Sequence, residues 1–300
     1  VLYNKTEGEI EVLAVNTLGV LYIVENGESV HSMADLKGKT IVAAGKGSTP
    51  EYALRYLLTE NGIDPDHDVT IDWKSEHSEC VAALASGQAS VALLPQPFVT
   101  VAQSKIEGLR MALDLNAEWD ALDNDSALIT GVIVARRAVV EENPAAVNEF
   151  LKEYAASVDW VNANTADAAA LIGEYGIVDA AVAEKALPYC NIVCITGAEL
   201  LEKLPGYLSV LYNADPAAVG GAIDAPAVLD ALGLAGNVQT AQLMSLILTR
   251  DARGALALLG RLYDGGKDVG AVLDELSALS RELLISATAG EGGESLLSGA

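Results

Sequence analysis

The sequence predicts an α/β protein followed by a small all-α helical bundle, and two observations lead to this fold class. Three short β-branched segments alternate with two amphipathic segments between residues 40 and 94, the order expected of parallel strands with helices on the sheet faces. The composition then changes at Gly220-Gly221. The three Trp, three His and three Cys residues all precede this pair, and Tyr263 is the single aromatic residue after it. Such a change predicts two domains, at 1–221 and 222–300.

The elements of the α/β part follow from the apolar pattern. Residues 10–24 are β-branched and almost continuously apolar, which is typical of strands buried on both faces, and Gly19 leaves open whether they form one strand or two. A helix after residue 51 is expected to end at Asn61-Gly62. Further strands are predicted at 41–45, 69–73, 90–94 and 127–135, with another helix at about 79–86.

The rest of the sequence has a helical pattern. Asn143 and Pro144 are predicted to begin a helix whose apolar stripe packs in a core, with members Val147, Phe150, Leu151, Tyr154, Val158 and Val161. Trp119, in the loop-like stretch 116–125, is expected to be the least buried Trp. Other helices are predicted near 166–175, 180–187 and 198–212, then at about 226–232, 238–250, 252–263 and 268–285, before a loose tail at 286–300.

The composition excludes several classes of protein. A hydrophobic fraction of 51% is ample for a packed interior and is not typical of disorder. The net charge of −24 repels phosphate backbones and anionic lipids, so we expect no direct nucleic-acid partner. No apolar run reaches the roughly 18 residues of a membrane span. The chain opens on Val1 without a secretory signal, which leaves its localisation open.

Cysteine and histidine form no recognisable metal or catalytic set. Cys190 and Cys194 have a C-x3-C spacing without a further Cys or His nearby, so we expect buried, inert thiols. Glu76, His77 and Glu79 invite a metal interpretation, but two acids equally fit the first turn of a helix. No nucleophile is followed by a recognisable base. The sequence therefore predicts a non-enzymatic protein without metal or cofactor.

Two loops are candidates for ligand binding. The sequence GKGSTPE at 45–51 joins a strand to a helix, with Ser48 and Glu51 spaced as a capping box, although Thr49 could equally be the cap. Glycines before a helix let the backbone approach an anionic group, but any strand-to-helix loop needs a glycine and a cap. Pro95-Gln96-Pro97 follows a buried strand, where Gln96 could contact a ligand or the prolines could simply make a rigid turn.

The segments VLYNKTEGEIEVLAVNTLGVLYIV, DLKGKTIVAAGKGSTPEYALRYLL and SVALLPQPF resemble the substrate-binding proteins of ABC importers, in the group of sulfonate, nitrate and thiamine-precursor binders. The resemblance covers 1–221 and implies a periplasmic-binding-protein-like fold, with two lobes of parallel or mixed sheet that close on a solute. The second lobe would span about 26–125, the hinge strands about 10–25 and 127–135, and the remainder of the first lobe 136–221. The first lobe is expected to be incomplete, because its front strand–helix units do not appear in this sequence.

The same resemblance implies a ligand site in the cleft. Gly47, Ser48, Thr49 and Gln96 would line it from the second lobe. The hinge would contribute Leu18 and Gly19, and the return crossing would contribute Ser126 and Thr130. The expected function is non-enzymatic binding of a small polar or anionic solute. The expected partners are that solute and, if the protein is exported, an ABC transporter permease.

The tail VLDALGLAGNVQTAQLMSLILTRDARGALALLGRLYDGGKDVGAVLDELSALSRELLI resembles the helical oligomerisation collar of the gamma/tau subunit of bacterial DNA polymerase III. This resemblance implies an alternative function, a clamp-loader fragment that acts as an interaction module and self-associates through its C-terminal helices. The first parent family acts outside the cytoplasmic membrane and the second in the cytoplasm. We therefore expect a chimeric chain, a fusion of fragments from two families.

Overall fold

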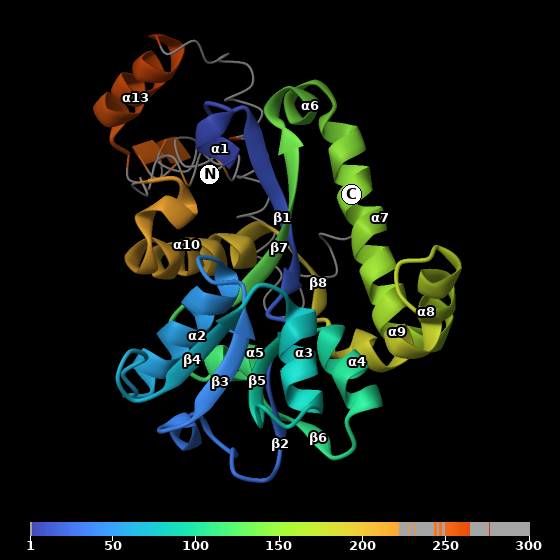
Figure 1. The fold of residues 1–300 in the computed structure, drawn as a ribbon. Helices are drawn as coiled ribbons and strands as arrows, with labels where there is room; N and C mark the ends of the chain where they lie inside the picture. Colours follow the sequence, from blue (N-terminus) through green and yellow to red (C-terminus); the bar gives the residue numbers. More distant parts are fainter. Residues whose placement is uncertain are drawn as a thin grey trace. The chain divides into compact units, whose positions relative to one another are not determined.

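A computed structural model of the chain describes residues 2–221 and, beyond them, residues 228, 231, 243–244, 246–247, 250–264 and 276. The chain divides into two compact units, 1–224 and 225–300. The first unit contains two β-sheets with helices around them (Figure 1). None of the described helices has the length and apolar character of a bilayer-spanning segment.

A five-stranded sheet of order β4-β3-β5-β2-β6 forms one half of the first unit. Strand β3 pairs in parallel with β4 and β5, and β2 pairs antiparallel with β5 and β6. This arrangement confirms the predicted alternation of strands and helices. The strands are β2 (Leu21–Asn26), β3 (Thr40–Ala44), β4 (Thr70–Lys74), β5 (Val91–Pro95) and β6 (Leu109–Asp114).

Helices cover both faces of this sheet (Figure 1). Alternate side chains of the strands, such as Tyr22 and Val42, pack with α3 (His77–Ala85) and α4 (Phe98–Lys105) in one apolar cluster. Helix α2 (Thr49–Glu60) contacts β3 and α5 (Leu115–Asp120), away from that cluster. A short 3-10 helix, η1 (Met33–Leu36), lies between β2 and β3. The sheet is therefore the centre of a fully covered core.

A three-stranded antiparallel sheet of order β7-β1-β8 forms the other half. Its strands are β1 (Ile10–Leu18), β7 (Ile129–Arg136) and β8 (Ile192–Ile195). The helices of this half are α1 (Leu2–Lys5), α6 (Arg137–Glu142), α7 (Pro144–Ala163), α8 (Thr165–Glu174), α9 (Ala180–Ala186), η2 (Leu187–Tyr189), α10 (Gly197–Ala214) and η3 (Pro216–Val219). The sequence pattern did not predict β6, β8, α5 or α6.

Gly19 is the point where the chain passes from one sheet to the other, so residues 10–24 form two strands. A Cβ at Gly19 would lie 2.6 Å from Leu128 Cδ2, which explains the requirement for glycine. The N–H of Gly19 donates to Asn116 Oδ1 at 3.1 Å, and its carbonyl accepts from Asn191 Nδ2. These bonds fix the crossing between the sheets.

The prediction that Trp119 is the least buried Trp is wrong. Trp119 is fully buried in α5, with its ring 4.7 Å from that of Tyr56 and 5.8 Å from that of Tyr207. Its indole N–H donates to Ser126 Oγ at 2.9 Å, so burial leaves no polar group unpaired. Trp160 is instead 41% exposed.

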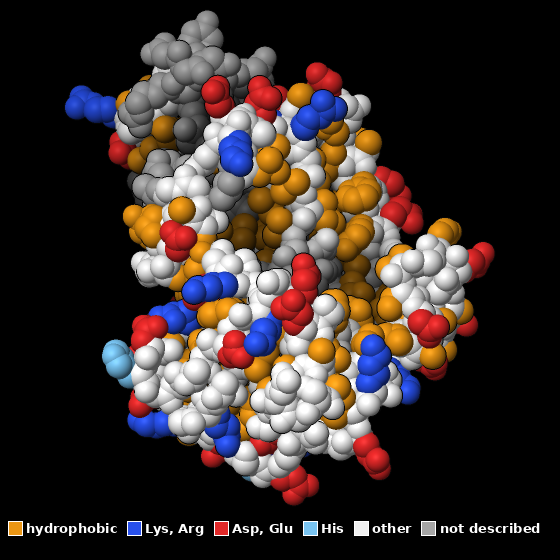
Figure 2. Space-filling model, viewed as in Figure 1, with side chains coloured by type: hydrophobic (Ala, Val, Ile, Leu, Met, Phe, Trp, Pro, Cys, Tyr) orange, Lys and Arg blue, Asp and Glu red, His pale blue; other side chains and the backbone are white. Residues whose placement is uncertain are grey.

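Two further expectations of burial are only partly met. In α7, Val158 is the only buried residue of the predicted stripe, and Phe150 is 48% exposed. Figure 2 shows hydrophobic side chains at the surface over β1, β7 and α7. Of the thiols, Cys80 is buried and its pKa is raised to about 11 by burial. Cys190 and Cys194 are half-buried.

The second unit is described in part. Helix α13 spans Ala252–Asp264, and one apolar cluster of this unit contains Leu243, Met244, Leu258 and Leu276. The predicted helices at 226–232, 238–250 and 268–285 and the loose tail at 286–300 fall largely or wholly outside the described residues.

Candidate functional site

The predicted ligand loops meet at one edge of the five-stranded sheet. Because β3, β4 and β5 are parallel, the loops after them lie at the same edge, where ligands bind in open α/β sheets. The N–H of Gln96 donates to the Val20 carbonyl at 2.9 Å, which brings the Leu18–Gly19 crossing to this edge. Leu18 pairs with Ile129, so the exposed Thr130 lies on the strand beside the Leu18–Gly19 crossing.

The start of α2 differs from the predicted capping box. Ser48 is the N-cap residue, but its Oγ donates to the Gly45 carbonyl at 2.7 Å, and Glu51 accepts from the N–H of Gly47 at 2.6 Å. Gly45 and Gly47 have φ values of 89° and 76°, so the loop curls back and takes up both side chains itself. The capping-box prediction is therefore wrong.

The curled loop leaves the first turn of α2 open. Among the described residues, the backbone N–H groups of Thr49 and Glu51 have no acceptor, and Pro50 has no N–H. A Cβ placed on Gly47 would meet no atom within 4 Å, so there is space in front of the loop. Unpaired N–H groups and the helix dipole together favour an anionic group here.

Gln96 does not present its side chain to the edge. The residue is 8% exposed, and its Oε1 accepts from the hydroxyl of Thr100 at 2.9 Å and from the N–H of Thr100 at 3.4 Å. Its Nε2 lies 4.0 Å from Met111 Sδ. The amide thus holds the start of α4, and the cis peptide bond between Gln96 and Pro97 forms the turn before that helix.

Ser126 links three elements beneath the edge. It accepts from Trp119 and donates to Asn124 Oδ1 at 2.8 Å, while Asn124 Nδ2 donates to the hydroxyl of Tyr56 at 2.8 Å. The backbone of α10 lies directly against it, because a Cβ on Gly206 would be 2.7 Å from Ser126 Cβ. Ser126 therefore connects α5, α2 and α10.

Two residues outside the predicted ligand loops have an unpaired polar atom near this edge. Among the described residues, His77 Nδ1 and Tyr207 Oη are the buried side-chain atoms without a hydrogen-bond partner. His77 begins α3 and its ring lies 5.2 Å from that of Phe98; burial lowers its pKa, which keeps the imidazole neutral at pH 7. The Tyr207 hydroxyl lies beside Thr49, and burial raises its pKa.

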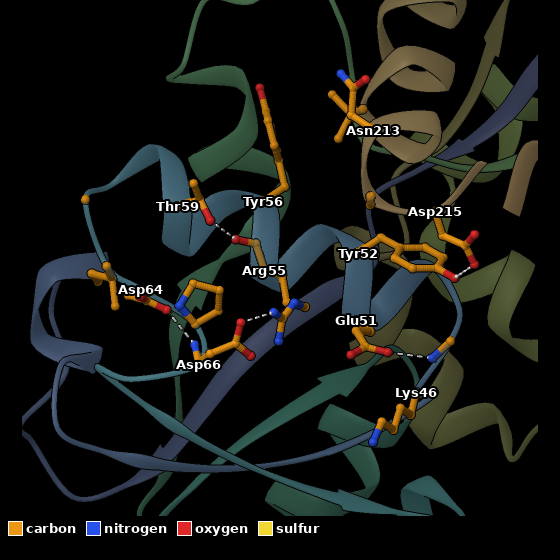
Figure 3. A pocket seen from close by; sticks show the side chains of 16 residues that line it. Lys46, Glu51, Tyr52, Arg55, Tyr56, Thr59, Asp64, Asp66, Asn213 and Asp215 are labelled. Carbon is orange, nitrogen blue, oxygen red and sulfur yellow. Dashed lines mark hydrogen bonds and ion pairs between the residues drawn. The ribbon is translucent and has the colours of Figure 1, made fainter. Parts of the chain in front are cut away.

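A groove of about 1130 Å³ begins at Lys46 and Gly47 and follows the outer side of α2 (Figure 3). The end of α10 and residues 62–66 form its other walls. Two bonds fix these walls: Tyr52 Oη to Asp215 Oδ2 at 3.1 Å, and Arg55 to Asp66 at 2.7 Å. Four carboxylates and two cations line the groove, so its lining has a net negative charge. The unpaired N–H groups at the start of α2 favour an anion instead. The charged lining residues are Lys46, Glu51, Arg55, Asp64, Asp66 and Asp215.

The metal alternative at residues 76–79 gains no support from the geometry. Glu79 accepts the N–H of Ser75 at 3.0 Å, as an acid in the first turn of a helix does. Within the part of the chain that the structure describes, no three or more His, Cys, Asp or Glu side chains are grouped to hold a metal ion.

Two family models match this sequence. Residues 4–185 match the model described as ABC transporter, phosphonate, periplasmic substrate-binding protein. Residues 223–299 match the model of DNA polymerase III subunits gamma and tau domain III. Both resemblances inferred from the sequence are thereby confirmed, and the chain combines segments of two families.

Curated relatives match the first part of the chain. Proteins of Brucella abortus (strain 2308) and Brucella suis biovar 1 (strain 1330), both named as binding proteins, are 28% identical over 180 residues. The match covers 60% of this chain and 54% of each relative, so the chain spans about half the length of the curated relatives it matches.

Solved structures share the fold. An ABC transporter protein from Parabacteroides distasonis has a TM-score of 0.62 at 23% identity and covers 75% of both chains. The aliphatic sulphonate binding protein SsuA of Escherichia coli has a TM-score of 0.57 at 18% identity, covering 72% of both chains. The alkanesulfonate-binding protein SsuA of Xanthomonas axonopodis pv. citri, bound to MOPS, has a TM-score of 0.52 at 18% identity, covering 75% of this chain and 76% of that chain.

These matches agree with the prediction of a non-enzymatic binding protein. The first family model covers more than half of the chain. The chain therefore belongs to the family of phosphonate-type periplasmic substrate-binding proteins of ABC transporters.

Proposed function

We propose that this chain binds a small organic anion of the sulfonate or phosphonate class for an ABC-type importer, whose permease is its partner. The observation that carries the proposal is the open first turn of α2, where the N–H groups of Thr49 and Glu51 have no acceptor among the described residues. Such a turn favours a group with several negatively charged oxygens. The relative from Xanthomonas axonopodis is an alkanesulfonate-binding protein bound to MOPS, which is a sulfonate.

We assign different roles to the expected site residues. Gly47, Ser48 and Thr49 would contact the anionic group, because the loop is exposed and has free space before it. Leu18, Gly19 and Thr130 would contact the organic part from the crossing between the sheets. Gln96 and Ser126 would shape the walls, since their polar atoms already have protein partners. The neutral His77 offers a further nitrogen.

The test is calorimetric titration of the full chain with MOPS, methylphosphonate and sulfate, with choline as a cationic control. We expect one of the anions to bind and to raise the free energy of unfolding by about 2.7 kcal/mol at a hundred times its Kd. Choline should have no effect. Absence of binding by all three anions would contradict the proposal.

A matched pair of glycine variants locates the site. Gly47→Ala and Gly87→Ala both place a side chain at positive φ, 76° and 72°, with open space around the Cβ. Each should therefore lose about 1 kcal/mol of stability. Gly47→Ala should also weaken anion binding, because the methyl group occupies the approach to α2. Equal affinity in the two variants would place the site elsewhere.

We also propose that the second unit self-associates, as the alternative function requires. Residues 223–299 match domain III of the gamma and tau subunits. In α13, Leu258 is buried while Leu256 is 70% exposed, so this helix has apolar residues outside its own cluster. Sedimentation velocity over a range of concentrations tests the proposal. A concentration-dependent oligomer that Leu256→Lys dissociates is expected, and a monomer at every concentration would exclude it.

A further inference from the structure

Helix α10 lies outside the residues that match the substrate-binding family model, 4–185, yet it packs beside the start of α2. Three contacts fix it there. The ring of Tyr207 meets Trp119 edge-on at 5.8 Å, Gly206 lies against Ser126, and Asp215 just after the helix accepts from the hydroxyl of Tyr52. The middle of α10 is therefore held at the candidate site.

Tyr207 has a polar atom without a partner in this packed position. The residue is 5% exposed, and its hydroxyl lies beside the side chain of Thr49 in the first turn of α2. Among the described residues, no group forms a hydrogen bond of normal geometry with this hydroxyl. A buried hydroxyl without a partner is unfavourable, and such groups are rare in folded proteins. A ligand oxygen at the start of α2 would supply the missing acceptor.

We propose that Tyr207 is a specificity-determining residue that completes the anion site, its hydroxyl donating to an oxygen of the bound sulfonate or phosphonate. This inference rests on the proposed function and deepens it. The N–H groups of Thr49 and Glu51 belong to α2, whereas the hydroxyl comes from a second helix. Donors on two helices suit a tetrahedral group with three oxygens, because different oxygens can accept from each side.

The charge state of the hydroxyl agrees with this role. Burial raises the pKa of Tyr207, so the phenol stays protonated at neutral pH and acts as a donor. Hydrogen bonds to a charged acceptor are stronger than those between neutral groups. Replacement of Tyr207 by Phe keeps the ring contact with Trp119 and removes only the donor.

The test uses the full chain, with MOPS and methylphosphonate as probes. Tyr207→Phe should bind the anion about 10- to 100-fold more weakly than the wild type. Its melting temperature without ligand should be equal or higher, because the variant removes an unpaired buried group. This combination of lower affinity with unchanged stability is not expected of a residue with a purely structural role.

Tyr22→Phe is the matched control. The hydroxyl of Tyr22 is also in a buried residue, but it donates to the Tyr189 carbonyl at 2.8 Å, so its loss should lower stability and leave affinity unchanged. If the wild type binds a probe and Tyr207→Phe binds it equally well, the role of Tyr207 is excluded and the proposed function stands. If affinity falls equally in both variants, the role of Tyr207 is likewise excluded. If the wild type binds neither probe, the proposed function fails and the inference fails with it.

Discussion

The five-stranded sheet and the three-stranded sheet bury their apolar side chains to different degrees. Ile23 and Leu93, in the five-stranded sheet, are at most 1% exposed, because helices cover both faces. In the three-stranded sheet, Val132 and Val134 of β7 are 38% and 40% exposed. Phe150 of α7, in the same half of the unit, is 48% exposed. Similar β-branched sequences thus reach different environments within one unit.

This difference shows where the stability of the unit resides. Hydrophobic stabilisation is proportional to the apolar area removed from water, so a Val that stays 40% exposed contributes less than one that is fully buried. The open start of α2 belongs to the well-covered half. The candidate site is therefore built on the better covered of the two sheets, which suits a preformed ligand site.

The largest expected effect comes from the aromatic contact between α5, α2 and α10. Trp119→Ala removes a fully buried indole and leaves Ser126 without its donor, so it should lower the free energy of unfolding by about 3–5 kcal/mol. Urea denaturation of the full chain, followed by circular dichroism, measures the change.

Trp160→Ala is the matched control for that variant. Trp160 lies in α7 and is 41% exposed, so its removal should change the free energy of unfolding by about 1 kcal/mol or less. Similar losses in the two variants would mean that the two halves contribute equally to stability, and would refute the comparison.

An intermediate effect is expected from the buried carboxylate of Glu25 in β2. It accepts from Ser29, from the N–H of Val30 and from Arg110. Burial opposes its ionisation, but these hydrogen bonds outweigh burial and lower the pKa of Glu25 below its ordinary value. Glu25→Gln should cost about 2–3 kcal/mol at pH 7, because Arg110 loses its charged partner.

The pH dependence of this effect has a definite sign. The folded protein binds the Glu25 proton less tightly than the unfolded chain, so stability falls as pH drops from about 4.5 through the lowered pKa. The difference between wild type and Glu25→Gln should therefore be full at pH 7 and shrink below about pH 4. Asp72→Asn, which removes an exposed pair with Lys74, should change stability by about 0.5 kcal/mol or less at pH 7. A difference that is constant from pH 7 to pH 3 would contradict the role of Glu25.

The fold was predictable where the apolar pattern is local. The strands expected at 69–73 and 90–94 are found one residue later. The first alternates apolar and polar residues and the second is a continuous apolar run, and turns bound both. Strand β8 was missed, since its four residues are too few to show a clear periodicity. The burial of Trp119 depends on Tyr56 and Tyr207, which lie far from it in the sequence, so no local pattern reveals it.

The candidate site was predictable where backbone chemistry decides it. Two glycines, a Ser-Thr pair and Pro50 between a strand and a helix are sufficient to locate the start of α2. The inward turn of Gln96 depends on the hydroxyl of Thr100, and the sequence does not reveal that rotamer. Tyr207 fits its helix as one more apolar position, and its unpaired hydroxyl becomes visible only when α10 is placed beside α2.

The smallest expected effect tests the exposed face directly, with the same substitution in both sheets. Val134→Thr in β7 should change the free energy of unfolding by about 0.5 kcal/mol or less, because the new hydroxyl can reach water and Thr suits a strand. Val24→Thr in β2 places the same hydroxyl in a fully buried cluster and should cost about 2 kcal/mol. Chemical denaturation of the full chain measures both values. An equal cost at the two positions would mean that the face of β7 is covered in solution. Repeating the measurement at lower protein concentration would then identify the cover. If a second copy of the chain covers β7, dilution should restore the difference between the two variants, and if another part of the same chain covers it, dilution should change nothing.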